Sequence, residues 1–492
     1  MTIQKKLPKI TYKKLSEKIK KNSPNVDLRV VKRAYLFSQK AHKGQKRKSG
    51  EEYLQHPLHT AFTLTELNLD TETIIAALLH DTLEDTSYTL SDIEKYFGRK
   101  VAKIVEGVSK LGQIKLRKDT KEYLAENLRK MFVAMAEDIR VILVRLADRK
   151  HNLQTLYALP RDKQIRIARE SLEVYAPIAE RLGMGEIKGR IEDLAFHYLY
   201  PKKFKSLEKR VRKFYKGKEK HTIIAKKKLK KLLKNSDVSF VDIHSRAKHT
   251  YSLHQKLQRY NDDIGQIYDI VALRVIVSDI ASCYKALGII HQYWKPLTGR
   301  IKDYIANPKP NGYQSLHTTV FCDDGKIIEI QIRTEKMHEE AEYGVAAHWY
   351  YSERDKKSDP LNLKKFSWVR DLAKWQQKNS NKDPGEFLKD LRTTFFEKHI
   401  FVFTPKGDPI SLPEGATPID FAFKVHTELG FQCQIAKVNG KIVRLNTKLA
   451  SGDLVEIMTL KNKSPSQDWL KFVKTHQARS KIRAWFRKKN GR

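Results

Sequence analysis

The sequence predicts a multidomain protein with an all-helical region, then an α+β region, then a small β-rich unit. At 492 residues the chain is too long for a single hydrophobic core and should divide into roughly three or four domains. Apolar residues recur every three or four positions in the N-terminal part, whereas short runs typical of strands begin near residue 238. With 40% hydrophobic residues, the chain can fill the cores of folded domains.

The helical pattern covers about residues 26–190. It is clear in Thr71 to Leu83 and in Glu137 to Leu156, where the apolar side chains would share one helix face. Residues 201–235 are also predicted to be helical but are densely basic, especially Lys226 to Lys234. Such a run is typical of a solvated connecting helix, and a dedicated RNA-binding helix is the alternative.

Strand-like runs then alternate with helical ones. The runs with strand character are Val238–His244, Ile267–Val277, Thr318–Phe321 and Ile327–Arg333, and the helical ones are Ser282–Trp294 and Glu335–Tyr351. This mixture predicts an α+β domain. After a polar bridge, Ile400 to Leu460 has the length and strand content of a β-grasp unit, and residues 464–492 are helical and basic.

The domain boundaries follow from these changes of pattern, of which the clearest is the one near Val238. We expect an all-α domain at 1–195, a basic helical linker at 196–237, an α+β domain at 238–352, a helical linker at 353–397, a β-grasp domain at 398–460 and the truncated start of a further helical domain at 461–492.

The charge balance is strongly basic. Lys and Arg number 96 against 57 Asp and Glu, which gives a formal net charge of +39. Such a field attracts polyanions, among them nucleotides, RNA, ribosomes and acidic membrane surfaces, although a lysine-rich proteome would give the same balance.

Cysteine usage and the N-terminus indicate a cytoplasmic protein. Cys283, Cys322 and Cys433 are far apart and form no CxxC pair, which argues against a disulfide framework or a zinc–cysteine site. Residues 1–21 lack the apolar core of a secretory signal, and no apolar run reaches the roughly 20 residues of a membrane span. We therefore expect no membrane partner.

The helical region contains a set of histidines and acidic residues that predicts a metal site. The set is His56, His80, Asp81, Glu84, Asp85 and Asp148. A continuous helix would place His80 and Glu84 one turn apart, and burying such a cluster without a cation would be costly. Imidazole and carboxylate ligands together favour Mn²⁺, Fe²⁺ or Zn²⁺ over Ca²⁺. A His-Asp pair alone is usually structural, but the whole set indicates a metal that activates water for attack on a phosphoester.

The α+β region contains a second set, typical of a Mg²⁺-nucleotide site. Strand alternation puts Glu329, Gln331 and Arg333 on one face, and Asp269 lies in another strand-like run. Cations that could neutralise a triphosphate are interspersed: Arg246, Lys248, Lys256, Arg274, Lys302 and Lys309. Tyr313 offers a face for stacking a base, although a single tyrosine is more often part of a core.

With these motifs the chain resembles the long-form RelA/SpoT homologues, the bifunctional (p)ppGpp synthetase/hydrolases of the bacterial stringent response, from about Lys32 to Arg487. The resemblance implies an all-α HD-type hydrolase domain, an α+β nucleotidyltransferase-like synthetase domain and a small β-grasp TGS domain. It implies transfer of pyrophosphate from ATP to the 3′-hydroxyl of GDP or GTP. It also implies hydrolysis of (p)ppGpp to GDP or GTP and pyrophosphate at a separate site.

In the hydrolase half, the resemblance implies that His56, His80, Asp81 and Asp148 hold Mn²⁺. Glu84 and Asp85 match an acidic pair that activates water. The positions that match nucleotide contacts are Arg47, Lys48, Ser49, Asn152 and Thr155.

In the synthetase half, Asp269 and Glu329 match Mg²⁺ ligands, and Glu329 is also the matching catalytic carboxylate. The expected substrate-binding residues are Arg246, Lys248, Ser252, Lys256, Arg274, Lys302, Lys309, Tyr313, Gln314 and His317. Tyr313 matches the tyrosine that stacks on guanine. The segment Arg300 to Asp303 has the basic form associated with bifunctional members.

The β-grasp unit resembles TGS, which in the family reads the tRNA 3′ end on the ribosome, and His426 matches the tRNA-contacting histidine. Ribosome and uncharged tRNA are therefore expected partners. The family's zinc-finger-like and ACT modules do not follow, which leaves ribosome-dependent control open.

Two other interpretations stay open. One is a hydrolase-dominant enzyme with a weak synthetase half, and the other is a ribosome- or tRNA-binding regulator with vestigial catalysis. Simultaneous activity of both sites would waste ATP. We therefore expect that a nucleotide bound at one site changes the helical segment at about residues 156–234 and thereby reduces the activity of the other site. The sequence does not determine the preference for GDP or GTP, the resting balance of the two reactions or the oligomeric state.

Overall fold

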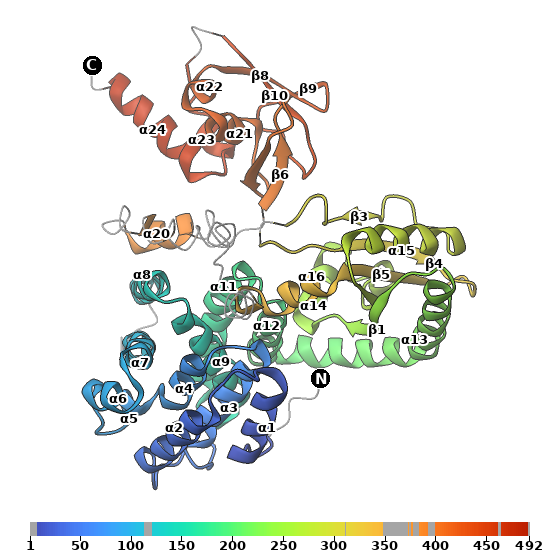
Figure 1. Cartoon of the computed structure of the whole chain (residues 1–492). Coiled ribbons are helices and arrows are strands. Elements are labelled where there is room, and N and C mark those ends of the chain that lie inside the picture. The colour runs from blue at the N-terminus through green and yellow to red at the C-terminus, as the bar shows by residue number, and fades with distance from the viewer. Residues whose placement is uncertain are drawn as a thin grey trace. The chain divides into compact units, whose positions relative to one another are not determined.

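The computed structural model in Figure 1 describes residues 7–112, 121–309, 311–347, 372, 375–376, 383–391, 399–460 and 464–490. Contacts divide the chain into two compact units, residues 1–119 with 127–374 and residues 120–126 with 375–492. Most of the helical linker predicted at 353–397 lies outside the described residues, as does Pro310 in the second site's motif.

The N-terminal part of the first unit is helical, in agreement with the predicted all-α class. Its elements are α1 (Tyr12–Asn22), α2 (Leu28–Ala41), α3 (Gln55–Leu64), η1 (Thr65–Leu67), α4 (Thr71–Leu79), α5 (Thr82–Asp85), α6 (Leu90–Phe97), α7 (Arg99–Gly112), α8 (Lys121–Glu137), α9 (Arg140–Gln154), η2 (Leu156–Ala158), α10 (Arg161–Glu170), η3 (Ser171–Tyr175), α11 (Ala176–Arg181) and α12 (Gly185–Leu199). Helices α3, α4 and α9 carry long buried stretches and contact one another, so they form the centre of this part.

The prediction of one helix from Thr71 to Leu83 is wrong, because α4 ends at Leu79 and α5 begins at Thr82. His80 and Asp81 form the corner between the two helices. Asp81 takes the N-cap position of α5, and its carbonyl oxygen accepts hydrogen bonds from the backbone N–H groups of Glu84 and Asp85. The break lets two adjacent side chains reach the same site.

The second part of the first unit is an α+β region, also as predicted. Its elements are α13 (Pro201–Asn235), β1 (Phe240–Ala247), α14 (Thr250–Arg259), η4 (Ile264–Gln266), β2 (Val271–Val277), α15 (Ile280–Tyr293), β3 (Lys302–Asp303), β4 (Leu316–Phe321), β5 (Ile327–Thr334) and α16 (Glu335–Tyr343). The strand order is β1-β2-β5-β4-β3, with β2 and β5 parallel and the other neighbours antiparallel. Helix α14 has no counterpart among the predicted elements.

The two faces of β5 differ as the alternation predicted. Ile328, Ile330 and Ile332 join a hydrophobic core with residues of α13 and α15, whereas Glu329 and Arg333 lie on the opposite face. Because α13 contributes Leu229 and Leu233 to this core, one face of the basic helix is buried beneath the sheet. The opposite face of the sheet is therefore left for polar groups.

The second unit contains the β-rich domain. Its elements are α20 (Pro384–Leu391), β6 (His399–Phe403), β7 (Pro409–Pro413), α21 (Pro418–Val425), α22 (Thr427–Phe431), β8 (Cys433–Val438), β9 (Lys441–Val443), β10 (Val455–Thr459), α23 (Trp469–Phe472) and α24 (His476–Asn490). The strands pair as β10-β8-β9 and β6-β7. Trp469 and Ile482 of the last two helices share a core with Phe423 of α21. Within the described part of the chain, no helix is long and apolar enough to cross a membrane.

Candidate active sites

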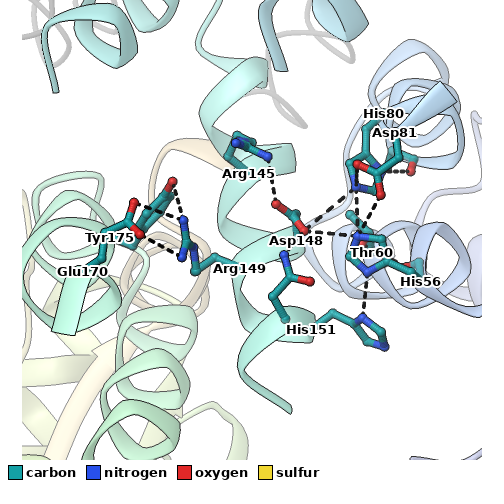
Figure 2. A network of polar contacts seen from close by, with 12 residues as sticks. His56, Thr60, His80, Asp81, Arg145, Asp148, Arg149, His151, Glu170 and Tyr175 are labelled. Carbon is teal, nitrogen blue, oxygen red and sulfur yellow. Dashed lines mark hydrogen bonds and ion pairs between the residues drawn. The ribbon is translucent and has the colours of Figure 1, made fainter. Parts of the chain in front are cut away.

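The predicted metal ligands of the helical region meet at one buried point, as Figure 2 shows. His56 comes from α3, His80 and Asp81 from the corner between α4 and α5, and Asp148 from α9. His56 Nε2 lies 3.2 Å from Asp81 Oδ2 and 3.2 Å from Asp148 Oδ1. His80 Nε2 lies 3.1 Å from Asp81 Oδ1 and 3.1 Å from His56 Nε2. His56, His80 and Asp148 are almost completely buried.

Hydrogen bonds on the far side of both rings leave their Nε2 atoms available for a metal. His80 Nδ1 lies 2.9 Å from the carbonyl oxygen of Ala77, so its Nδ1–H donates there and the lone pair is on Nε2. His56 Nδ1 lies 2.7 Å from His151 Nδ1. Burial holds the pKa of His151 well below its usual value, and a neutral His151 can accept the proton of His56 Nδ1.

The two carboxylates are also held from behind. Arg145 Nη1 donates to Asp148 Oδ2 at 3.0 Å, and Asn152 Nδ2 donates to Asp148 Oδ1 at 2.5 Å. Burial by itself would raise the pKa of Asp148, but His56 and Arg145 lower it well below its usual value. Asp148 is thus an anion with one oxygen directed at the histidines.

Tyr53 joins the two acidic residues of the corner helix. Its hydroxyl lies 2.9 Å from Asp81 Oδ2 and also contacts Asp85 Oδ2. Its ring stacks on His42 with centroids 4.6 Å apart. Loss of hydration around the carboxyl group of Glu84 raises its pKa to about 7, and so do the negative charges of neighbours that include Asp81 and Asp85.

The residue types and the geometry fit a divalent metal. Two imidazole lone pairs and two carboxylates converge in a buried space, and a cation removes the repulsion that they would otherwise feel.

The predicted nucleotide contacts of this half lie around the same site. Arg47 Nη2 donates to Asn152 Oδ1 at 2.8 Å, which connects it to Asp148 through a single amide. Lys48 and Ser49 follow in a turn in which Gly50 N donates to the Arg47 carbonyl oxygen, and Lys48 is exposed. Thr155 is buried, and its hydroxyl donates to the His151 carbonyl oxygen at 3.2 Å.

Sequence reasoning missed three residues that support the ligands: Tyr53, Arg145 and His151. Arg145 and His151 lie three residues before and after Asp148, on the same helix. That spacing is a usable signal, because residues three apart on a helix are neighbours. Tyr53 has no such signal, since it lies 28 residues from Asp81.

In the α+β region, Asp269 and Glu329 lie near enough for the charge of Asp269 to act on Glu329. Glu329 is in β5 and pairs in register with Ala272 of β2. Asp269 lies in the turn directly before β2, not within a strand as predicted. The turn frees its side chain from the sheet's alternation.

Two lysines contact one oxygen of Asp269. Lys248 Nζ and Lys256 Nζ each lie 2.5 Å from Asp269 Oδ2. Burial would raise the pKa of Asp269, but the two ammonium groups lower it to about 2. The other oxygen, Oδ1, is buried and has no hydrogen-bond partner among the described residues. An anionic carboxylate with one unpartnered oxygen fits a Mg²⁺ ligand.

Glu329 is held between His317 and Gln331. His317 Nδ1 lies 3.3 Å from Glu329 Oε1, and Gln331 Nε2 donates to the same oxygen at 2.9 Å. Burial opposes ionisation, yet these contacts hold the pKa of Glu329 below its usual value. The His317 ring is itself fixed by the Tyr313 hydroxyl, 2.8 Å from Nε2.

Aromatic rings gather on the β4–β3 side of Glu329. Tyr304 and Tyr313 have centroids 6.0 Å apart, and Lys309 Nζ lies 4.7 Å from each ring. Lys302 pairs with His317 across β3 and β4. Gln314 instead donates to the carbonyl oxygen of Ile305 at 3.1 Å.

Arginines gather on the other side, toward β2 and β1. Arg246 of β1 pairs in register with Ala272, and Arg274 of β2 pairs with Gln331. Ser252 is on α14, the helix that also carries Lys256. The structure therefore brings the predicted cations to both sides of the two carboxylates.

In the second unit, His426 is exposed at the junction of α21 and α22.

Three family models match the chain in the order of these domains. Residues 34–185 match an HD domain, residues 245–356 match the region found in RelA/SpoT proteins, and residues 400–459 match a TGS domain. The three matches coincide with the helical region, the five-stranded sheet and the β-rich domain.

Curated relatives match nearly the whole chain. A GTP pyrophosphokinase of Myxococcus xanthus is 48% identical over 94% of this chain and 61% of its own length. A guanosine-3′,5′-bis(diphosphate) 3′-pyrophosphohydrolase of Aquifex aeolicus is 48% identical over 93% of this chain and 64% of its own. The bifunctional (p)ppGpp synthase/hydrolase RelA of Mycobacterium tuberculosis is 43% identical over 94% and 63%. The chain thus spans less than two thirds of the length of each of these relatives. By its three domains and these identities, it belongs to the RelA/SpoT family.

Proposed function

We propose that the chain is a bifunctional alarmone enzyme that makes (p)ppGpp in the α+β domain and hydrolyses it in the HD domain. The observation that carries the proposal is that one polypeptide contains both polar clusters, in which neighbouring cations hold Asp148 and Asp269 in their ionised form. The relatives that match over more than 90% of this chain are named for one or both of the two activities. A vestigial half would be expected to have lost such residues.

In the hydrolase half, His56, His80, Asp81 and Asp148 would hold the metal, for which we propose Mn²⁺. A bound divalent ion acidifies water and polarises a phosphoryl oxygen. Glu84 and Asp85, on the helix that follows Asp81, would take the proton from the attacking water. The nucleotide would be bound by the set that surrounds Asn152: Arg47, Lys48, Ser49, Asn152 and Thr155.

In the synthetase half, the 3′-hydroxyl of GDP or GTP attacks the β-phosphorus of ATP. The new bond joins the 3′-oxygen to that phosphorus, and the bond to the α-phosphate oxygen breaks, so AMP leaves. Glu329, held by His317, would accept the hydroxyl proton, and Asp269 with Glu329 would bind Mg²⁺.

The guanine nucleotide would lie against Tyr313 on the β4–β3 side of Glu329, with Lys302, Lys309, Gln314 and His317 around it. ATP would lie on the β2–β1 side, where Arg246 and Arg274 face the same surface, with Lys248, Ser252 and Lys256 near Asp269. Cations on both sides would neutralise the charge that develops during transfer.

For the TGS domain we propose a tRNA contact through the exposed His426, and ribosome and uncharged tRNA as partners in the cytoplasm. TGS is generally a ribosome- or tRNA-associated domain. Equal binding of charged tRNA, uncharged tRNA and an unrelated RNA by the chain would contradict the proposal.

The experiment that tests the proposed enzyme follows labelled ATP with GDP by thin-layer chromatography, and labelled ppGpp in a parallel reaction. We expect Asp81→Ala to abolish hydrolysis and spare synthesis, and Glu329→Gln to do the reverse. Removal of metal with a chelator should stop both reactions, and re-addition of Mn²⁺ or Mg²⁺ should show which ion serves each site. A wild-type chain that forms no 3′-pyrophosphorylated product, or that leaves ppGpp intact, would overturn the corresponding half of the proposal.

A further inference from the structure

Two buried arginines on neighbouring strands share one carboxylate beside the synthetase site. Arg274 of β2 and Arg333 of β5 are 3% and 0% exposed. Arg274 Nη1 donates to Glu342 Oε1 at 2.9 Å, and Arg333 Nη2 donates to the same oxygen at 3.1 Å. Glu342 comes from α16, the helix that directly follows β5. A single acid therefore fixes two guanidinium groups from two strands.

This cluster carries more positive charge than Glu342 neutralises. Burial by itself would raise the pKa of Glu342, but the charges of Arg274, Arg246 and Arg333 lower it, so three arginines act on one carboxylate. Burial and the charge of Arg333 lower the pKa of Arg274 to about 10, which still leaves its guanidinium protonated at neutral pH. Buried cations in excess of anions are costly unless a further anion or acceptor meets them.

Several donors of the two arginines point to such a further group. Nε and Nη2 of Arg274 and Nε and Nη1 of Arg333 are buried and have no hydrogen-bond partner among the described residues. The same holds for Oε1 of Gln331, which pairs in register with Arg274. Buried polar groups are satisfied in almost all folded proteins, so unmatched donors beside a catalytic carboxylate indicate a ligand.

The position of the two arginines indicates which nucleotide would lie next to them. Arg274 and Arg333 lie on the same face of the sheet as Glu329: Arg274 is on the neighbouring strand β2, and Arg333 is four residues further along β5. The aromatic pair Tyr304 and Tyr313 lies on the β4–β3 side. If guanine stacks there, the group next to Arg274 is ATP.

We propose that Glu342 and Arg333 are positioning residues that hold Arg274 in place for ATP during synthesis. The inference rests on the proposed synthetase activity and deepens it. Glu342 restricts the Arg274 side chain to one orientation, in which Nε and Nη2 stay free for the nucleotide. Arg333 binds the same oxygen and prevents Glu342 from turning away. Neither residue needs to touch a reacting atom.

The test compares Glu342→Gln with the matched control Glu335→Gln, which removes the same charge from an exposed position on the same helix. For each chain, synthesis is measured against ATP and against GDP, and hydrolysis of ppGpp is measured in the same preparation. We expect Glu342→Gln to raise the KM for ATP about tenfold or more, with the KM for GDP changed less than about twofold. Hydrolysis and the control variant should match the wild type.

Two further variants separate positioning from general damage. Arg333→Met, which removes the second guanidinium that holds Glu342, should also raise the KM for ATP and leave the KM for GDP nearly unchanged. If Glu342→Gln does not fold, as judged by lost hydrolysis, Glu342→Asp keeps the charge but withdraws the carboxylate by one methylene and should raise the KM for ATP several-fold. An unchanged KM for ATP in the folded variant, or equal rises for ATP and GDP, overturns the positioning role. Absence of synthesis by the wild type would instead overturn the proposed function.

Discussion

The imidazole of His249 is paired with the carboxylate of Asp193, with Nδ1 and Oδ2 2.9 Å apart. Asp193 belongs to α12 of the helical region, and His249 is the N-cap residue of α14 in the α+β region. The other oxygen of Asp193 accepts the backbone N–H of Tyr251 at 2.8 Å. Asp193 thus caps a helix of the neighbouring domain, and that helix carries Lys256, which contacts Asp269. The close approach depends on Gly189, because a Cβ there would lie 2.2 Å from the His249 ring.

Asp193→Ala should lower the free energy of unfolding by about 1 to 3 kcal/mol, because it removes the helix cap and leaves the partly buried His249 with Glu186 alone as an anionic partner. Synthesis should fall more than hydrolysis, since α14 bears Lys256 whereas the predicted metal ligands of the HD domain lie on other helices. Denaturant unfolding and both activity assays provide the measurement. Asp162→Ala, at an exposed position in the first turn of α10, is the control. Equal loss of both activities would contradict this view of the cap.

The same contact should make stability depend on pH. Burial by itself would lower the pKa of His249, but Asp193 and Glu186 raise it to about 9 from an ordinary value of 6.5. The folded chain therefore binds this proton more tightly than the unfolded chain does. The stabilisation is complete below about pH 6.5 and is lost as the pH rises through about 9, with a magnitude of about 3 kcal/mol. Unfolding of the wild type and of His249→Gln should differ most near pH 6 and converge above pH 9. A constant difference across this range would exclude the His249 proton as its source.

His151→Ala should weaken metal binding by about 10- to 100-fold, because His56 loses the group that fixes its tautomer and orientation. Direct titration of the chain with Mn²⁺ measures this without relying on activity. His151→Gln offers an oxygen to the His56 Nδ1–H and should recover part of the affinity. His59→Gln, which replaces a ring stacked on His151 with centroids 4.7 Å apart, is the control. If His151→Ala binds Mn²⁺ as the wild type does, the His56–His151 contact has no part in holding the ligand.

Asp420→Asn should loosen the last two helices from the TGS domain. The carboxylate is completely buried and accepts hydrogen bonds from the hydroxyl and N–H of Thr417 and from the N–H groups of Lys474 and Thr475. An amide replaces one acceptor oxygen with donors that face other donors, at a cost of about 3 kcal/mol. Limited proteolysis of the full chain should then cut earlier within residues 464–490. Glu414→Gln, an exposed substitution in the same domain, should leave the cleavage pattern unchanged.

The sequence by itself determined the order of the domains and the residue types of both candidate sites. The alternation Ile-Glu-Ile-Gln-Ile-Arg in β5 assigns one face to the core and the other to polar groups, because successive side chains of a strand point in opposite directions. The set from His56 to Asp148 contains the imidazole and carboxylate types that a divalent metal requires. Residue type and local period are properties of short segments, and so they can be read without knowing the fold.

The tertiary structure alone decided which groups support those residues. The Tyr53 hydroxyl beside two carboxylates, the cap that Asp193 provides for α14, and the sharing of Glu342 by two arginines each depend on packing between distant segments. Asp193 and Tyr251 are 58 residues apart, and Arg274 and Glu342 are 68 apart. No local period encodes such a distance. These contacts form only after the apolar faces of the helices and strands have packed together. That packing determines which polar groups lie close enough to form hydrogen bonds and ion pairs with one another.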